Sequence, residues 1–242
     1  MLAASGADRY VTPYMWGVVG LMVNQPLAEK EYGAPLPNSW SLIFDPEATE
    51  RLVKCGVSML NAEQEAVSLK MTYKGLRLGG SGARRIHKEV AGLLNPGVRL
   101  SPADYNLFHE QMASGEVCVA MTWDLLVPRD EKKSGLRFSV PEEGGLIFID
   151  SMAVPKNAIN PKLAYAFMNF LLEPSAMARN SRLSHAVPAI RASLLPDGDA
   201  RLRRGFSREE RKRLYLLDSL SEKQRKLLGD AWQALSLEKT PQ

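Results

Sequence analysis

A carboxylate and an aromatic ring, two residues apart near the end of an apolar strand, are the side chains best suited to chemistry in this chain. Residues 142–155 read EEGGLIFIDSMAVP: a glycine turn, an apolar strand carrying Phe148 and Asp150, and a proline that stops the strand. A carboxylate offers charge and hydrogen-bond acceptance to an ammonium group, and a ring face offers cation–π attraction. The pattern therefore indicates a cationic ligand. The alternative is a core strand whose aspartate caps the next element, and the stretch alone favours it.

Other segments of the chain accompany this strand in a recognisable order. They are PYMWG at 13–17 running to GLMVN at 20–24, PNSW at 37–40 leading to FDPE at 44–47, CGVSML at 55–60, SGEVCVA at 114–120 and NPKLAYAFMNFLL at 160–172. In this order and at these spacings they resemble the spermidine/putrescine-binding proteins, the periplasmic receptors of polyamine ABC importers. The resemblance extends from about Val11 to about Leu195 and weakens toward the C-terminus. With this context we favour a ligand site over the core-strand alternative.

The resemblance implies an α/β, periplasmic-binding-protein-like fold, in which two lobes joined by crossover strands grip the ligand between them. Residues 18–134 and 188–242 would form a near-complete lobe. Residues 1–17 and 135–187 would form the remnant of a truncated second lobe. Such receptors are about half as long again, with a secretory signal and a segment ahead of the residues matched by Pro13. Residues 1–7 have neither a basic nor an apolar signal region, so we expect an N-terminally truncated receptor, periplasmic by resemblance but cytoplasmic if made as given.

The same resemblance implies a set of ligand-binding residues. Asp150 matches the carboxylate that faces a ligand ammonium, and Phe148 matches a ring beside the alkyl chain. Trp123 matches an aromatic wall of the cleft, with a core tryptophan as the alternative. Glu65 matches a glutamate at a helix N-terminus that faces the cleft, with a first-turn glutamate stabilised by the helix dipole as the alternative.

The chain departs from the family pattern at two places. The family acid lies three residues after the tryptophan, where this chain has Leu126. Asp124 could replace that acid only if the loop is rebuilt, and we include it as a candidate on that condition. A cleft tyrosine of the family is replaced by Ala186, and we expect the adjacent His185 to face solvent.

The two cysteines, Cys55 and Cys118, lie too far apart in sequence for a zinc knuckle or a Cys-x-x-Cys motif. Isolated buried thiols would be the default for a cytosolic chain. The resemblance implies instead a disulfide, which would contribute about 4 kcal/mol by loop-closure entropy. That bond needs an oxidising compartment, so it conflicts with the expectation of a chain without a secretory signal.

Composition is that of an ordinary soluble globular protein, with 242 residues, 45% hydrophobic and 24% charged residues, and a net charge of +4. No apolar run is long enough to predict a transmembrane helix. The basic residues between 201 and 213 suggest either a nucleic-acid patch or a solvated loop and helix start. We favour the second, because no aromatic or nucleic-acid motif accompanies them, and so expect no nucleic-acid partner.

Catalytic motifs are absent from the sequence. His87, His109 and His185 are far apart, no Gly-x-Ser-x-Gly elbow occurs, and the loop GGSGARR at 79–85 lacks the Gly-Lys-Ser/Thr ending of a phosphate-binding loop. The paired acids Glu142 and Glu143 are expected on an exposed turn. The sequence therefore predicts no enzyme, no cofactor, no metal site and no catalytic residue.

The elements that must position the site alternate between short strands and helices, which is typical of an α/β protein. Strands are predicted at 14–23, 57–60, 117–122, 136–140 and 146–152. Helices are predicted after an Asn61 cap, and at 84–94, 104–113, 161–172, 175–184, 207–217 and 221–235. The helix begun by Pro161 carries an apolar stripe of Leu163, Phe167, Phe170 and Leu171.

Three functions are compatible with these observations. The first is polyamine binding (putrescine or spermidine) as the solute-binding subunit of an ABC importer, impaired by the missing segment. Its partners would be the polyamine, the importer's membrane subunits and a separate N-terminal fragment. The second is a truncated or split-gene product without independent ligand binding. The third is a cytosolic adaptor that reuses the intact lobe.

Overall fold

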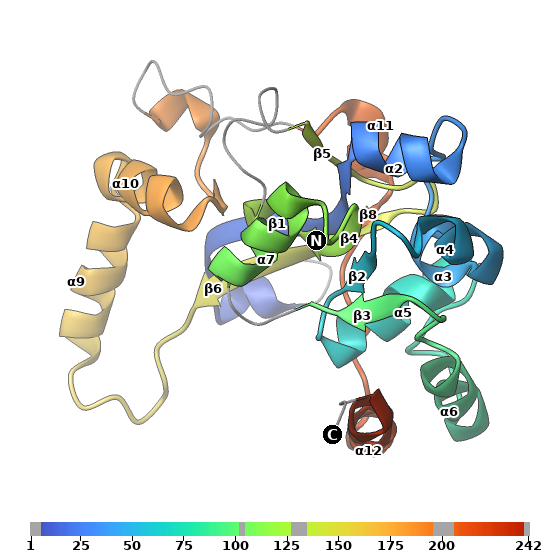
Figure 1. The fold of residues 1–242 in the computed structure, drawn as a ribbon. Helices are drawn as coiled ribbons and strands as arrows, with labels where there is room; N and C mark the ends of the chain where they lie inside the picture. Colours follow the sequence, from blue (N-terminus) through green and yellow to red (C-terminus); the bar gives the residue numbers. More distant parts are fainter. Residues whose placement is uncertain (1–5, 102–104, 127–134, 196–205, 240–242) are drawn as a thin grey trace. The chain divides into compact units, whose positions relative to one another are not determined.

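The structure is a computed structural model that describes residues 6–101, 105–126, 135–195 and 206–239 (Figure 1). These residues fall into two contact units. The larger comprises Val19–Leu146 and Arg213–Gln242, and the smaller comprises Met1–Val18 and Ile147–Lys212. Two strands, β1 (Thr12–Asn24) and β6 (Gly145–Met152), contribute residues to both units. The mixed strands and helices confirm the α/β class.

A sheet with strand order β3-β2-β4-β1-β6-β8 organises the larger unit. Besides β1 and β6, its strands are β2 (Val57–Met59), β3 (Val98–Leu100), β4 (Val119–Trp123) and β8 (Leu214–Tyr215). Strand β2 is parallel to both β3 and β4, whereas β4 is antiparallel to β1. A further strand, β5 (Leu136–Ser139), also pairs antiparallel with β1. The carboxyl ends of β2, β3 and β4 therefore lie along one edge of the sheet.

Helices of the larger unit surround this sheet and supply its core. They are α2 (Gln25–Tyr32), α3 (Ser41–Phe44), α4 (Pro46–Leu52), α5 (Glu63–Tyr73), α6 (Ala83–Ala91), α7 (Tyr105–Ser114) and α12 (Glu222–Lys239). Helix α12 packs against α6 and α5. Asp45 caps α4 by accepting hydrogen bonds from the amides of Glu47 and Ala48. Trp40 is fully buried, and its indole Nε1 donates to the carbonyl of Gly144 at 2.7 Å.

The smaller unit contains the first part of β1, the rest of β6, one further strand, three α-helices and the 3-10 helices Ala7–Arg9 and Ala192–Leu194, counted over the described residues. The strand and the α-helices are β7 (Val187–Pro188), α9 (Pro161–Leu171), α10 (Pro174–Ser184) and α11 (Arg208–Lys212). Strand β7 pairs antiparallel with β1 at Met15 and Trp16, and α10 packs against both β7 and α9. The predicted start of α9 is confirmed, because the Asn160 side chain accepts a hydrogen bond from the amide of Leu163. Helix α9 nevertheless buries none of its residues.

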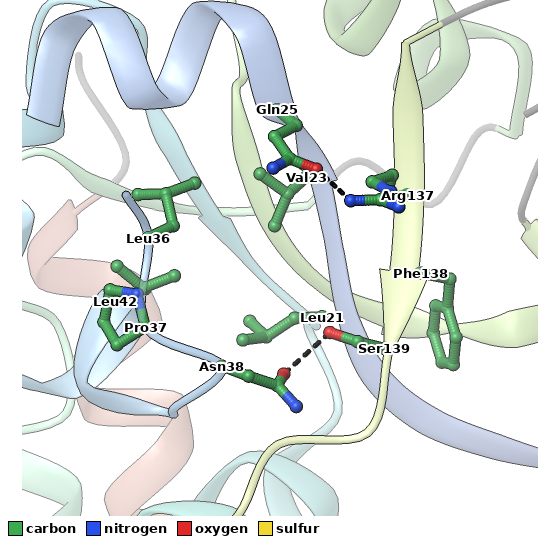
Figure 2. A pocket seen from close by; sticks show the side chains of 10 residues that line it. All are labelled: Leu21, Val23, Gln25, Leu36, Pro37, Asn38, Leu42, Arg137, Phe138 and Ser139. Atoms are coloured by element: carbon green, nitrogen blue, oxygen red, sulfur yellow. Dashed lines mark hydrogen bonds between the residues drawn. The ribbon is translucent and has the colours of Figure 1, made fainter. Parts of the chain in front are cut away.

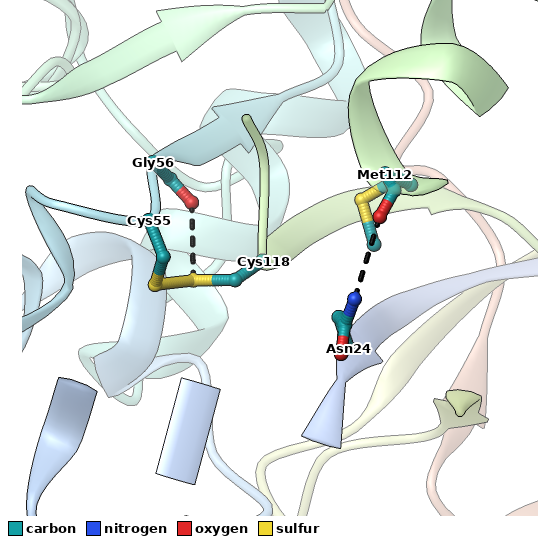
Figure 3. Close-up of a disulfide and its surroundings, with 5 residues drawn as sticks. All are labelled: Asn24, Cys55, Gly56, Met112 and Cys118. Carbon is teal, nitrogen blue, oxygen red and sulfur yellow. Dashed lines mark hydrogen bonds between the residues drawn. A yellow bond between two sulfur atoms is a disulfide. The ribbon is translucent and has the colours of Figure 1, made fainter. Parts of the chain in front are cut away.

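A disulfide joins Cys55 to Cys118 inside the larger unit (Figure 3). Their Cα atoms are 5.4 Å apart, within the range that a disulfide requires. Cys55 follows α4 and Cys118 precedes β4, and both side chains are buried. The proximity implied by the family resemblance is therefore confirmed, and the alternative of isolated thiols is not.

Two local predictions from the sequence are wrong. Asn61 does not cap α5: the helix starts from Ala62 without a side-chain cap, and the Asn61 side chain accepts from the indole of Trp232 instead. The helix predicted at 207–217 stops at Lys212, because Leu214 and Tyr215 form β8 beside β6. In both cases a contact distant in sequence replaces the local preference.

The contact units also differ from the expected lobes over two segments. Residues 135–146 belong to the larger unit, because β5 pairs with the second half of β1. Residues 188–212 belong to the smaller unit, because β7 pairs with the first half of β1. Of the basic cluster, residues 201–205 lie outside the described residues. Arg208, Arg211 and Lys212 are exposed on helix α11, where Lys212 pairs with Glu209 at 2.9 Å. Arg213 follows the helix, is half-buried and donates to the carbonyl of Val140 at 3.1 Å.

Candidate functional site

Trp123 is the last residue of β4 and lies at the edge where the parallel strands end. It pairs with Val19 of β1, is half-buried, and packs against the main core of the larger unit. The side chain is therefore packed against the core while the residue keeps part of its surface exposed. The tryptophan has features of both interpretations that the sequence allowed, a cleft wall and a core residue.

Glu65 lies at the same edge of the larger unit. Helix α5 begins four residues after β2 ends, and Glu65 is the third residue of the helix, half-buried in its first turn. Because β2 and β4 are neighbouring parallel strands, their carboxyl ends bring the start of α5 and the end of β4 to one side of the sheet. The crevice at the carboxyl ends of parallel strands is the usual ligand position in α/β proteins.

Asp124 follows Trp123 but differs from it in exposure. It begins the 3-10 helix Asp124–Leu126, and only 1% of its surface is exposed. A ligand in solvent could contact this carboxylate only after the 3-10 turn opened.

Phe148 and Asp150 belong to the smaller unit, on β6. Alternation along the strand places both on one face, Phe148 half-buried and Asp150 exposed. The intervening residues Ile147 and Ile149 point to the opposite face. There they line an apolar hollow of about 400 Å³ together with Pro13, Trp16, Pro188, Ala189 and Ile190. Thus the described hollow of the smaller unit is on the other face of β6 from the two predicted site residues.

His185 and Ala186 have structural roles. His185 caps the end of α10 in the left-handed conformation, with φ of 62°, and its amide donates to the carbonyl of Ser181 at 2.8 Å. It is half-buried, so the expectation that it faces solvent is only partly met. Ala186 is buried, and its carbonyl accepts from the Ser181 hydroxyl at 2.6 Å.

A second hollow, of about 360 Å³, lies in the larger unit (Figure 2). Its walls are apolar side chains from β1, α3 and the loop before α3: Leu21, Val23, Leu36, Pro37 and Leu42. Polar groups of Gln25, Asn38, Arg137 and Ser139 line the remainder. Arg137 donates to the Gln25 side-chain oxygen at 2.6 Å, and the Ser139 hydroxyl donates to the Asn38 side-chain oxygen at 2.8 Å. No sequence motif pointed to this hollow, because its lining comes from three segments that are apart in the chain.

The loop at 79–85, for which the sequence allowed a phosphate cradle, is bound to the C-terminal segment instead. Asp218 accepts hydrogen bonds from Arg77 at 2.6 Å and from the Gly79 amide at 2.9 Å. Burial opposes ionisation of Asp218, but these hydrogen bonds outweigh it and lower the pKa of its carboxyl. The Gly79 amide is thus already bound to a carboxylate, which supports the connector that the sequence favoured.

Glu143 is also less exposed than the sequence suggested. It is half-buried, and its carboxylate accepts hydrogen bonds from the Ser39 hydroxyl and, at 3.2 Å, from the Trp40 amide. It therefore joins the turn before β6 to the start of α3. Glu142 remains exposed.

Two further groups outside the expected site have strongly shifted pKa values. Burial lowers the pKa of Lys70 from 10.5 to about 8, assisted by the positive charge of Lys74 and opposed by Glu89. Burial also raises the pKa of Tyr215 to about 12. Both side chains join packed helices and strands of the larger unit, so we assign them to stability. Among the described residues, no group of three or more His, Cys, Asp or Glu side chains could hold a metal ion.

The comparison with protein-family models identifies the family to which this chain belongs. Residues 4–203 match the family model for the bacterial extracellular solute-binding proteins. The chain belongs to this family. Among curated members, the putrescine/agmatine-binding protein of Pseudomonas aeruginosa is 28% identical over 237 residues, covering 93% of this chain and 64% of that protein. The putrescine-binding periplasmic protein PotF of Escherichia coli is 33% identical over 187 residues, covering 72% and 50%.

Solved structures share the fold. The spermidine/putrescine transporter substrate-binding protein PotD of Streptococcus pneumoniae superposes with a TM-score of 0.70 at 21% identity, covering 96% of this chain and 70% of that one. A GABA receptor, Atu4243, superposes equally well, with a TM-score of 0.72 at 16% identity. The periplasmic-binding-protein-like fold is thus confirmed. Because the GABA receptor shares it, the fold does not fix the ligand.

The chain spans half to two thirds of the length of the first curated family members it matches. In the part of the chain that the structure describes, no helix is long and apolar enough to cross a membrane.

Proposed function

We propose that this chain binds a polyamine, putrescine or spermidine, as part of the solute-binding subunit of an ABC importer. Its curated family members named above are putrescine-binding proteins. The observation that carries the proposal is the topology of the larger unit. There Glu65 and Trp123 follow two adjacent parallel strands and so share the edge at which α/β proteins bind ligands.

The residue types at that edge and on β6 suit a linear diamine. In the larger unit Glu65 would accept hydrogen bonds from an ammonium group while Trp123 buries methylene groups, and on β6 of the smaller unit Asp150 and Phe148 would offer the same pair of contacts. Asp124 is 1% exposed, so we place the ligand charges on Glu65 and Asp150, with Asp124 contributing only if its turn opens.

We further propose that residues 1–242 alone bind putrescine weakly. Asp150 is exposed and Glu65 is half-buried, and exposed ion pairs contribute only about 0–1 kcal/mol each. Two such pairs and two ring contacts total roughly 4 kcal/mol or less, which corresponds to a dissociation constant of about 1 mM or weaker. Tight binding would require a closed site in which the charges are desolvated.

The smaller unit offers a surface for a polypeptide that would complete such a site. Five large apolar side chains on or beside α9 are more than half exposed: Ile159, Leu163, Tyr165, Phe167 and Phe170. Leu163, Phe167 and Phe170 recur at helical spacing and so share one face of α9. An exposed apolar face of this kind marks an interaction surface. We propose that it packs against a segment equivalent to the unmatched part of the longer family members, carried on the same polypeptide or made separately. This surface also favours the second candidate, a product without independent ligand binding.

The disulfide suggests the compartment. A bond between Cys55 and Cys118 persists in an oxidising environment such as the bacterial periplasm. We therefore propose that this chain functions in the periplasm, as PotF does by name, and that the membrane subunits of the importer are its docking partners.

Isothermal titration of the purified chain with putrescine and spermidine tests the proposal. We expect a weak, salt-sensitive signal that Asp150→Ala removes and that Asp230→Ala, at an exposed aspartate of α12, retains. Titration in the presence of a polypeptide carrying the segment ahead of the matched region, taken from a longer family member, should strengthen binding at least tenfold. Absence of binding in both experiments would refute polyamine binding. A micromolar constant for the chain alone would instead refute the proposed weakness.

A further inference from the structure

We infer that the hollow of the larger unit beside β1 and β5 binds small monocarboxylates with a branched or cyclic apolar body. This site is separate from the residues proposed for the polyamine and has the opposite charge preference. Its volume of about 360 Å³ falls within the range of small-molecule pockets, about 300–1,000 Å³.

The apolar part of the hollow is preformed. Leu36, half-buried, and Pro37, exposed, supply its accessible apolar surface from the loop before α3. Leu21 and Leu42, which are 1% and 0% exposed, lie beneath this surface as part of the core and support it. Figure 2 shows Leu36 and Pro37 on the side of the hollow opposite Arg137. Phe138 points away from them in this view, and its ring lies over Gly20 instead. A small aliphatic group of a ligand can therefore pack against Leu36 and Pro37 without any rearrangement of the core.

The charge of the hollow favours an anion. Among the residues that the structure describes, Arg137 is the single charged one that lines the hollow, and its side chain is exposed. One guanidinium nitrogen donates to Gln25, so the remaining N–H groups can form the paired hydrogen bonds that a carboxylate accepts. The carboxylates of Glu29 and Glu143 are engaged in hydrogen bonds of their own. Glu29 accepts from the Gln25 amide at 2.7 Å, and Glu143 accepts from Ser39 and Trp40.

The far end of the hollow offers one further polar contact. The Asn38 side-chain nitrogen donates to the Val140 carbonyl at 2.9 Å, and its oxygen accepts from Ser139. This leaves the second N–H of the Asn38 amide and the acceptor capacity of the Ser139 hydroxyl for a ligand. A hydroxyl group on the apolar body would satisfy both. We therefore expect hydroxylated monocarboxylates to bind better than plain ones of the same shape.

A set of probes with one apolar body and different head groups tests the inference. We would titrate 4-methylpentanoate, 4-methylpentanamide and 4-methylpentan-1-amine into the isotopically labelled chain and follow backbone amide signals. Saturable shifts at Leu36, Asn38 and Ser139 are expected for the carboxylate, with the amide and the amine binding at least tenfold more weakly. Equal shifts for all three probes, or none at up to about 50 mM carboxylate, would overturn the inference.

Matched arginine variants separate the charge from the fold. Arg137→Gln should weaken carboxylate binding at least tenfold, because charge-assisted hydrogen bonds are lost. Arg99→Gln, at an exposed arginine of β3 that pairs with Glu116 outside the hollow, should leave it unchanged. Both variants should keep the wild-type melting temperature. Equal binding by the two variants would overturn the inference. Putrescine titration of Arg137→Gln should match wild type, so failure of the polyamine proposal is distinguishable from failure of this one.

Discussion

Replacing Lys70 by methionine should abolish a rise in stability that we expect for the wild-type chain between pH 7 and 9.5. The side chain of Lys70 is buried between α5 and α6. Its ammonium donates to the carbonyl of Glu89 at 2.9 Å and to the carbonyl of Gly92, and lies 3.8 Å from the Glu89 carboxylate. The same carboxylate also pairs with Lys74 at 2.6 Å. The buried ammonium of Lys70 therefore shares the Glu89 carboxylate with the ammonium of Lys74.

The sign of the effect follows from the lowered pKa. The pKa of Lys70 is about 8 in the folded chain against 10.5 for a free lysine. Between these values the unfolded chain binds more protons than the folded one, so the free energy of unfolding increases with pH. Integrating from pH 7 to 9.5 gives a gain of about 2 kcal/mol. Above about pH 10 the raised pKa of Tyr215 acts in the opposite direction, which sets the upper limit of the window.

Urea unfolding at pH 7, 8, 9 and 9.5 measures this gain. Tryptophan fluorescence reports on the relevant unit, since Trp40, Trp123 and Trp232 all belong to the larger one. Methionine keeps the apolar volume of Lys70 but cannot titrate, so the variant should show no gain over this range. Lys226→Met, at an exposed position of α12, should retain the wild-type gain. Stability that is flat in the wild type, or an unchanged slope in Lys70→Met, would refute the proposed electrostatic penalty.

Two further predictions concern covalent and steric features of the larger unit. Replacing Cys55 and Cys118 together by serine should lower the free energy of unfolding by about 2–5 kcal/mol, because the disulfide closes a loop across 63 positions. Equal urea midpoints for the oxidised wild type and this variant would contradict the prediction. Gly20→Ala should cost about 1–3 kcal/mol, since the added Cβ would lie 2.6 Å from the Phe138 ring. Gly80→Ala, where a Cβ meets nothing within 4 Å, is the control that should remain near wild type in the same unfolding experiment.

The sequence by itself determined the class, the family and most of the elements of this protein. The alternation of apolar strands and capped helices predicted the α/β class, and Asn160 with Pro161 predicted the start of α9 because a cap depends only on neighbouring residues. The family resemblance, and not the residues alone, implied that Cys55 and Cys118 pair. The same resemblance also selected Glu65, Trp123, Phe148 and Asp150 as site candidates.

Only the tertiary structure decided features that depend on contacts between distant segments. Leu214 and Tyr215 became a strand because β6 offered unpaired backbone groups, although the local sequence predicted a helix. The Lys70 environment and the hollow near Arg137 each combine residues that are apart in the chain, so no local motif could indicate them. Asp124 is a plausible ligand residue by type and position, yet folding buries it. A residue's type sets what chemistry it can perform, but its burial and partners set whether a ligand can reach it.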